Sequence, residues 1–155
     1  MVSEISGSTG RVAWGIISDK FYNGKRIIIL LMIGIITAIC SVTVAILPET
    51  ISFWALAPII SIFGFAISGF NGIWMNLASE LVPKEQAGIS SGFSILFGSA
   101  GVIVMPPLFG LLVDETGNYA IGWFFIAALM IVVLLILMII HQQEKRKFKY
   151  AGSKL

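Results

Sequence analysis

The segment GRVAWGIISDKFYNGKR, residues 10–26, gathers charged side chains next to a long apolar run. Asp19 and Lys20 are adjacent, and Lys25 and Arg26 follow after four residues. A carboxylate at a helix end can pair with a nearby base or accept hydrogen bonds from N–H groups that begin a neighbouring helix. Near a membrane interface, such ties can hold two helices together in one conformation and release them in another. We therefore interpret the segment as part of a gate, the alternative being a solvated loop that only fixes topology.

Arg11 lies eight residues before Asp19. On one helix this separation is about 12 Å of rise, which would place Arg11 close to the bilayer midplane. An Arg at that depth costs at least about 2.5 kcal/mol unless it meets a partner or water. Because a guanidinium suits a carboxylate or a phosphate, we predict that Arg11 contacts an anionic substrate. The alternative is that Arg11 pairs with Glu4 or caps backbone carbonyls.

A second group of candidate substrate contacts lies in the uncharged part of SGFNGIWMNLASE, residues 68–80. Asn71 and Trp74 are three residues apart and share a helix face, whereas Asn76 lies about 140° round the helix from Asn71. Amides at lipid depth either bind a ligand or hydrogen-bond to neighbouring helices. We predict that Asn71, Trp74 and Asn76 contact substrate, with helix packing as the alternative.

Membrane helices must position all of these residues. Of the 155 residues, 57% are hydrophobic and 12% are charged, against about 45–50% and about 25% in soluble domains. Four runs contain no Asp, Glu, Lys or Arg, namely 27–47, 53–78, 89–113 and 119–140. Each reaches the roughly 20 residues that a helix needs to cross the hydrocarbon of a bilayer. We predict an all-α integral membrane protein with four full transmembrane helices.

Residues 1–19 differ from these runs, because their apolar stretch, Val12 to Ile17, has only six residues and follows a run rich in Gly and Ser. Such a segment cannot span a bilayer alone as a lipid-facing helix. We predict that it forms a partial transmembrane helix that packs inside a protein.

Charge alternates between the loops. The bases gather in the loop 20–26, at Lys84 and in the tail 141–155, whereas the loops 48–50 and 114–118 hold acids and no base. By the positive-inside rule, the basic segments face the cytoplasm. We predict a multi-pass protein of the cell (inner) membrane whose basic C-terminal tail is cytoplasmic and lies against the lipid bilayer, the alternative being a topology anchor in water.

Other classes of function find little support. The four runs contain no Asp, Glu or His, which argues against a proton relay inside them. The sequence has no Cys/His metal spacing, no phosphate loop and no nucleophile motif. We expect no enzyme activity, no metal, no cofactor and no nucleic-acid partner.

The loop motif resembles the signature loop of the major facilitator superfamily, in which a Gly, an Asp, a base and a Gly followed by bases link two helices. Gly15, Asp19 and Lys20 match this order, and Lys25 and Arg26 come two residues later than in the common form.

Two further segments carry the same resemblance. ELVPKEQAGISSGF, residues 80–93, is similar to the link between the tenth and eleventh helices of that superfamily, and MPPLFGLLVDETGNY, residues 105–119, to the eleventh helix entering its outer loop. The resemblance covers residues 10 to about 140 and implies the end of the eighth helix followed by helices nine to twelve. It also implies that Glu80 belongs to the same cytoplasmic charge network as Asp19.

Pro106 and Pro107 each remove a backbone donor, and we predict a helix kink there.

The resemblance implies secondary active transport of a small solute, which Arg11 suggests is an organic anion, by alternating access. This chain would be the C-terminal part of a transporter, and the N-terminal half would be its partner. Two alternatives stay open. One is a self-sufficient four-helix homodimeric transporter of the multidrug type, which would rely on a membrane-embedded carboxylate. The other is a membrane scaffold protein that transports nothing.

Overall fold

The computed structural model describes residues 2–21, 25–48 and 50–152, and the side chains of residues 9–20, 25–48 and 50–143. Within these ranges the regular elements are all helical. They are α1 (Val2–Phe21), α2 (Arg26–Ile46), α3 (Phe53–Glu80), the 3₁₀ helix η1 (Lys84–Gln86), α4 (Ala87–Thr116) and α5 (Tyr119–Gly152).

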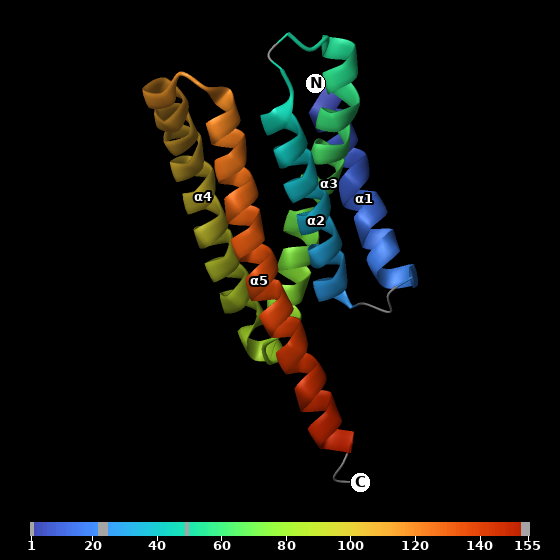
Figure 1. Cartoon of the computed structure of the whole chain (residues 1–155). Helices are drawn as coiled ribbons and strands as arrows, with labels where there is room; N and C mark the ends of the chain where they lie inside the picture. The colour runs from blue at the N-terminus through green and yellow to red at the C-terminus, as the bar shows by residue number, and fades with distance from the viewer. Residues whose placement is uncertain (1, 22–24, 49, 153–155) are drawn as a thin grey trace.

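Four helical segments, one for each of α2 to α5, are long and apolar enough to cross a membrane. Their chain directions alternate, so the end of α1, the start of α2, the turn η1 and the end of α5 all lie toward the bottom of Figure 1. The α4–α5 connection and the end of α2 lie toward the top. The prediction of an all-α membrane protein with four full spans is confirmed.

Several helices extend beyond the apolar runs. Helix α3 continues to Glu80, α4 includes Asp114 and Glu115, and α5 continues through the basic segment to Gly152. An apolar run marks the part of a helix that hydrocarbon covers, whereas backbone hydrogen bonding can continue into the polar interface. Glu, Gln, Lys and Arg favour helix, so the start of the predicted tail extends α5.

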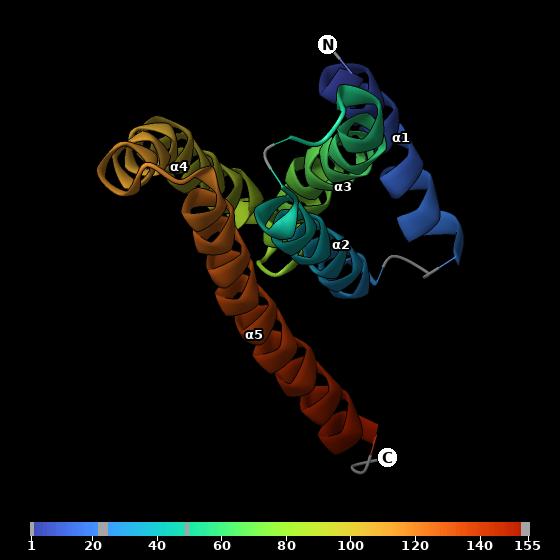
Figure 2. The same cartoon turned by 45° about the horizontal axis from the view of Figure 1, so that its top comes forward.

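Helix α1 is continuous over 20 residues and packs along α3 (Figures 1 and 2). A Cβ added to Gly10 would overlap the carbonyl of Phe65, and one added to Gly69 would overlap the ring of Trp14. The Trp14 Nε1 donates a hydrogen bond to the Phe65 carbonyl oxygen at 3.1 Å. The small residues thus allow close contact with α3. The other side of α1 is exposed at Arg11, Val12 and Ile16, so its packing inside a larger protein stays a prediction.

The core centres on α2, which packs against both α3 and α5. Ile29, Leu30 and Ile33 are completely buried there. Gly34 lets α5 approach, because a Cβ added at that position would lie 2.8 Å from Leu134 Cδ2. Nearby hydroxyls on α2 bond to backbone carbonyls one turn earlier, so they do not present unpaired donors to the core.

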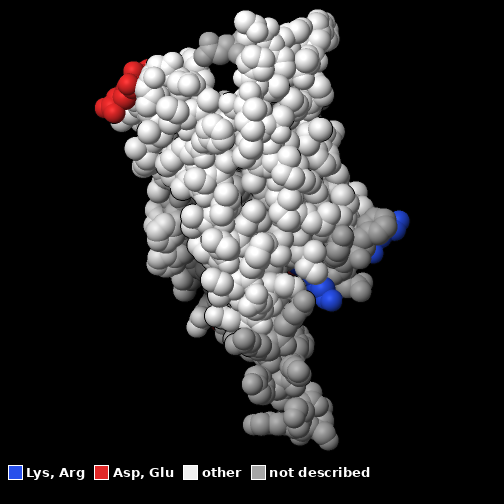
Figure 3. Space-filling view, in the orientation of Figure 1, with Lys and Arg blue, Asp and Glu red and all other residues white. Residues whose placement is uncertain are grey.

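Helix α4 is set apart from this core (Figure 2). It contacts α3, η1 and α5, yet Val113 is its one buried residue. Gly117, at φ 64°, closes α4 in the left-handed conformation that glycine adopts most readily. The space-filling view shows Asp and Glu at this end, Lys and Arg toward the opposite half, and uncharged surface between (Figure 3).

Candidate functional site

Three helix ends meet in a group of charged residues that we name the Arg26 cluster: Asp19, Arg26 and Glu80. Asp19 lies in the last turn of α1, Arg26 is the first residue of α2, and Glu80 is the last residue of α3. The Arg26 Nε lies 2.8 Å from each Glu80 carboxylate oxygen. The Arg26 Nη1 lies 3.8 Å from Asp19 Oδ1. One guanidinium therefore links α1, α2 and α3.

The two ion-pair contacts of the Arg26 cluster, one with Glu80 and one with Asp19, differ in strength. The Arg26 side chain is 15% exposed, against 50% for Glu80 and 69% for Asp19. The Arg26–Glu80 contact is short and partly shielded from water, whereas the Asp19 contact is long and well solvated, so the first dominates. A base at the start of α2 and an acid at the end of α3 also oppose their own helix dipoles. The pair therefore serves the contact between helices and not the stability of either helix.

Other residues of the predicted gate lie around this cluster without joining it. Lys20 and Lys25 are exposed, and neither forms an ion pair with a described side chain. Gly15 lies one turn before Asp19, and a Cβ added there would meet no described atom within 4 Å. Of the three bases near Asp19, Arg26 is thus the one that pairs with described acids.

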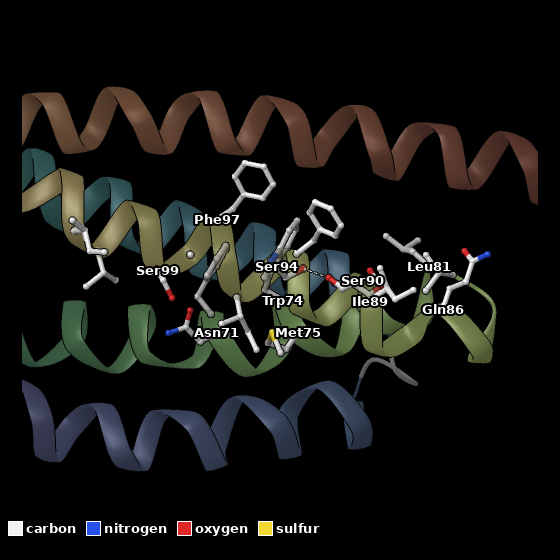
Figure 4. Close-up of a pocket in the computed structure, with 18 residues that line it drawn as sticks. Asn71, Trp74, Met75, Leu81, Gln86, Ile89, Ser90, Ser94, Phe97 and Ser99 are labelled. Carbon is white, nitrogen blue, oxygen red and sulfur yellow. Dashed lines mark hydrogen bonds between the residues drawn. The ribbon is translucent and has the colours of Figure 1, made fainter.

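A groove of about 1210 Å³ lies between the second half of α3 and the first half of α4 (Figure 4). Of the predicted substrate contacts, Asn71 and Trp74 line it. None of the 18 residues that line the groove is charged. The groove is therefore suited to uncharged parts of a ligand.

Each wall of the groove carries a pair of stacked aromatic rings. On α3, the Phe70 and Trp74 ring centroids are 6.1 Å apart and the planes are 5° from parallel. On α4, the Phe93 and Phe97 centroids are 6.5 Å apart at 24°. Our sequence reasoning missed Phe70, Phe93 and Phe97. The spacing of four residues within each pair is the signal that could have revealed them.

The polar groups of the groove are partly engaged within the protein. The Ser90 hydroxyl donates to the Ala78 carbonyl at 2.7 Å, and the Ser94 hydroxyl donates to the Ser90 carbonyl at 3.0 Å. The Asn71 side chain is exposed and forms no hydrogen bond with the residues that the structure describes. Its amide is thus available to a ligand or to a helix outside this chain.

Arg11 is exposed on α1 and forms no ion pair with a described side chain, while the Glu4 side chain lies outside those described. Gly10, the residue before Arg11 on α1, contacts Phe65 on α3. Along the helix axes, Arg11 therefore lies about level with the residue that follows Phe65. Asn71 comes about five residues after that level, or about 8 Å closer to the Arg26 cluster. Arg11 does not line the groove.

Two further predictions concern α3 and α4. Asn76 is exposed and is not among the described residues that line the groove. Pro106 and Pro107 lie inside α4, which is helical on both sides of them, and Pro58 lies inside α3. The substrate contact of Asn76 and the kink at the two prolines stay predictions.

Comparison with known proteins places the whole chain in one family. The family model described as Major Facilitator Superfamily matches residues 1–154. A probable galactarate/D-glucarate transporter of Bacillus subtilis is 30% identical over 117 residues, which make up 74% of this chain and 26% of that protein.

Two other relatives show similar coverage. Monocarboxylate transporter 10 of Mus musculus is 29% identical over 120 residues, or 77% of this chain and 23% of that protein. Autophagy-related protein 22 of Neurospora crassa is 24% identical over 136 residues, or 82% of this chain and 18% of that protein. The chain thus spans about a quarter or less of the length of these relatives. No solved structure matches it significantly.

Proposed function

The chain belongs to the major facilitator superfamily, and we propose that it is the C-terminal part of a secondary transporter that moves a small organic anion by alternating access. It would supply the end of the eighth helix and helices nine to twelve, and an N-terminal half would complete the central pathway. This proposal is supported by the matched relatives named as transporters, of whose length this chain covers 23–26%.

The observation that carries the proposal is the Arg26 cluster. Its short ion pair lies at the ends of two helices, where a modest movement separates the charges into water. Because Glu80 is half exposed, the contact contributes about 1 kcal/mol, which is the lower end of the free energies by which ligand binding shifts a conformational equilibrium. We propose that the cluster holds the cytoplasmic side closed in one state and opens in another. The basic residues of this end support its cytoplasmic orientation.

The chemistry of the chain supports an organic anion as substrate. The Bacillus subtilis relative is named for galactarate and D-glucarate, and the Mus musculus relative for monocarboxylates. All of these are carboxylates, and Arg11 is an exposed base on α1, which packs along α3. We propose that Arg11 binds the carboxylate, while Asn71 and Trp74 contact the rest of the substrate. Asn76 would contact substrate outside the groove.

Uptake by proteoliposomes that contain the complete transporter tests this function. Labelled lactate and labelled galactarate cover the two kinds of carboxylate, and we expect saturable uptake of at least one. Arg11→Ala should raise KM about tenfold or more, because a charge-assisted contact is lost. Lys84→Ala, which removes an exposed base of η1, should leave KM unchanged and serves as the control. Correctly inserted protein without saturable carboxylate uptake would overturn the proposal.

A further inference from the structure

The groove presents aromatic rings from two different helices. The exposed fractions of Phe93 and Phe97 are 59% and 72%, so both rings are open to contact from outside the chain. Phe97 and Trp74 both line the space between α4 and α3 (Figure 4). Aromatic rings favour stacked or edge-on contact with another flat ring. The two walls therefore suit a flat apolar group between them.

The groove offers little to a substrate with many polar groups. None of the 18 lining residues is charged, and the hydroxyl protons of Ser90 and Ser94 are already donated to backbone carbonyls, which leaves Asn71, Gln86 and Ser99 as the remaining polar side chains. Each hydroxyl of a sugar acid that entered the groove would need a partner there, and a missing partner costs affinity. A second carboxylate would find no base within it. These features disfavour a hydroxylated dicarboxylate as the occupant.

We infer that the groove between α3 and α4 binds a flat apolar group, such as an aromatic ring, of a substrate that has a single carboxylate. This inference rests on the proposed function. The ring lies along Trp74 and Phe97. The Asn71 amide hydrogen-bonds to a polar substituent of the ring where one is present. The carboxylate stays outside the groove, because none of the described residues that line it is a base.

Competition and kinetics in proteoliposomes with the complete transporter test this inference. We expect 3-phenylpropanoate to inhibit lactate uptake at a concentration at least about tenfold lower than galactarate does, because only its ring can use both aromatic walls. Trp74→Ala and Phe97→Ala should each raise KM for 3-phenylpropanoate about tenfold, and Phe97→Ala should change KM for lactate less than about twofold. Trp74→Phe should recover most of the affinity. Trp54→Ala, at an 83% exposed ring outside the groove, is the matched control and should change neither KM.

A site-directed label shows whether the substrate occupies the groove itself. Ser94→Cys places a thiol in the groove, and 3-phenylpropanoate should slow its reaction with a maleimide, whereas galactarate should not. Equal labelling rates with and without 3-phenylpropanoate would indicate that lipid alone fills the groove and would overturn the inference. Stronger inhibition by galactarate, or an equal effect of Phe97→Ala on both KM values, would overturn it as well while leaving carboxylate transport intact. Absence of any carboxylate uptake would instead overturn the proposed function together with the inference.

Discussion

The Arg26 cluster makes a quantitative prediction about which acid matters most. Arg26 meets Glu80 at 2.8 Å through two oxygens and Asp19 at 3.8 Å through one. A hydrogen bond between charged groups contributes about 1.5–3 kcal/mol when shielded from water. Glu80 is 50% exposed and Asp19 is 69% exposed, which reduces the expected costs to about 1–1.5 kcal/mol for Glu80→Gln and to less than about 0.5 kcal/mol for Asp19→Asn.

A double-mutant cycle on the free energy of unfolding checks this ranking. The chain is unfolded with SDS in mixed micelles, as wild type, Arg26→Gln, Glu80→Gln and the double variant. We expect a coupling energy of about 1 kcal/mol between Arg26 and Glu80, decreasing with added salt. The same cycle with Asp19→Asn should give less than about 0.5 kcal/mol. Additive effects of Arg26→Gln and Glu80→Gln, or a larger coupling to Asp19, would refute this reasoning.

Three other predictions concern packing and topology. Gly69→Ala should lower the free energy of unfolding by about 1–3 kcal/mol, because its Cβ would overlap the Trp14 ring. Gly72→Ala on the same helix, with no described atom within 4 Å of the added Cβ, should not destabilise the protein in the same assay. Trp14→Phe should cost about 1 kcal/mol by removing the hydrogen bond to Phe65, and an unchanged unfolding midpoint would contradict that contact. In intact cells, an impermeant maleimide should label Glu115→Cys but not Lys84→Cys, and the reverse pattern would invert the proposed topology.

The sequence predicted the spans well because bilayer thickness fixes how many consecutive apolar residues a helix needs. The runs 27–47 and 53–78 correspond to α2 and α3 within two residues at each end. Residues 1–19, predicted as a partial helix, correspond to α1, although helix formation in its Gly/Ser-rich start does not follow from hydropathy. Its contact with α3 depends on Gly10 meeting the Phe65 carbonyl, 55 residues away in the chain. A contact of this range follows from tertiary packing and not from local pattern.

The candidate site was also predictable only in part, because it too depends on tertiary packing. The family resemblance linked Glu80 to the network of Asp19, but the sequence left open which base would join it. Arg26 does so because it begins α2 beside the end of α3, whereas Lys20 and Lys25 are exposed. The shared face of Asn71 and Trp74 followed from helical spacing. The facing wall from α4 did not, because α4 lacks a distinct apolar side that would orient it.

Counterflow is the most direct test of whether this chain belongs to an alternating-access carrier of carboxylates. Proteoliposomes that contain the complete transporter are loaded with unlabelled carboxylate and diluted into a trace of the labelled compound. We predict transient accumulation of label above its external concentration, because a carrier exchanges one substrate molecule for another. Proteoliposomes with the 155-residue chain alone should show none, because in the proposed function the chain supplies only part of the pathway. Label that only equilibrates, or that never enters vesicles containing correctly inserted complete transporter, would contradict the carrier mechanism.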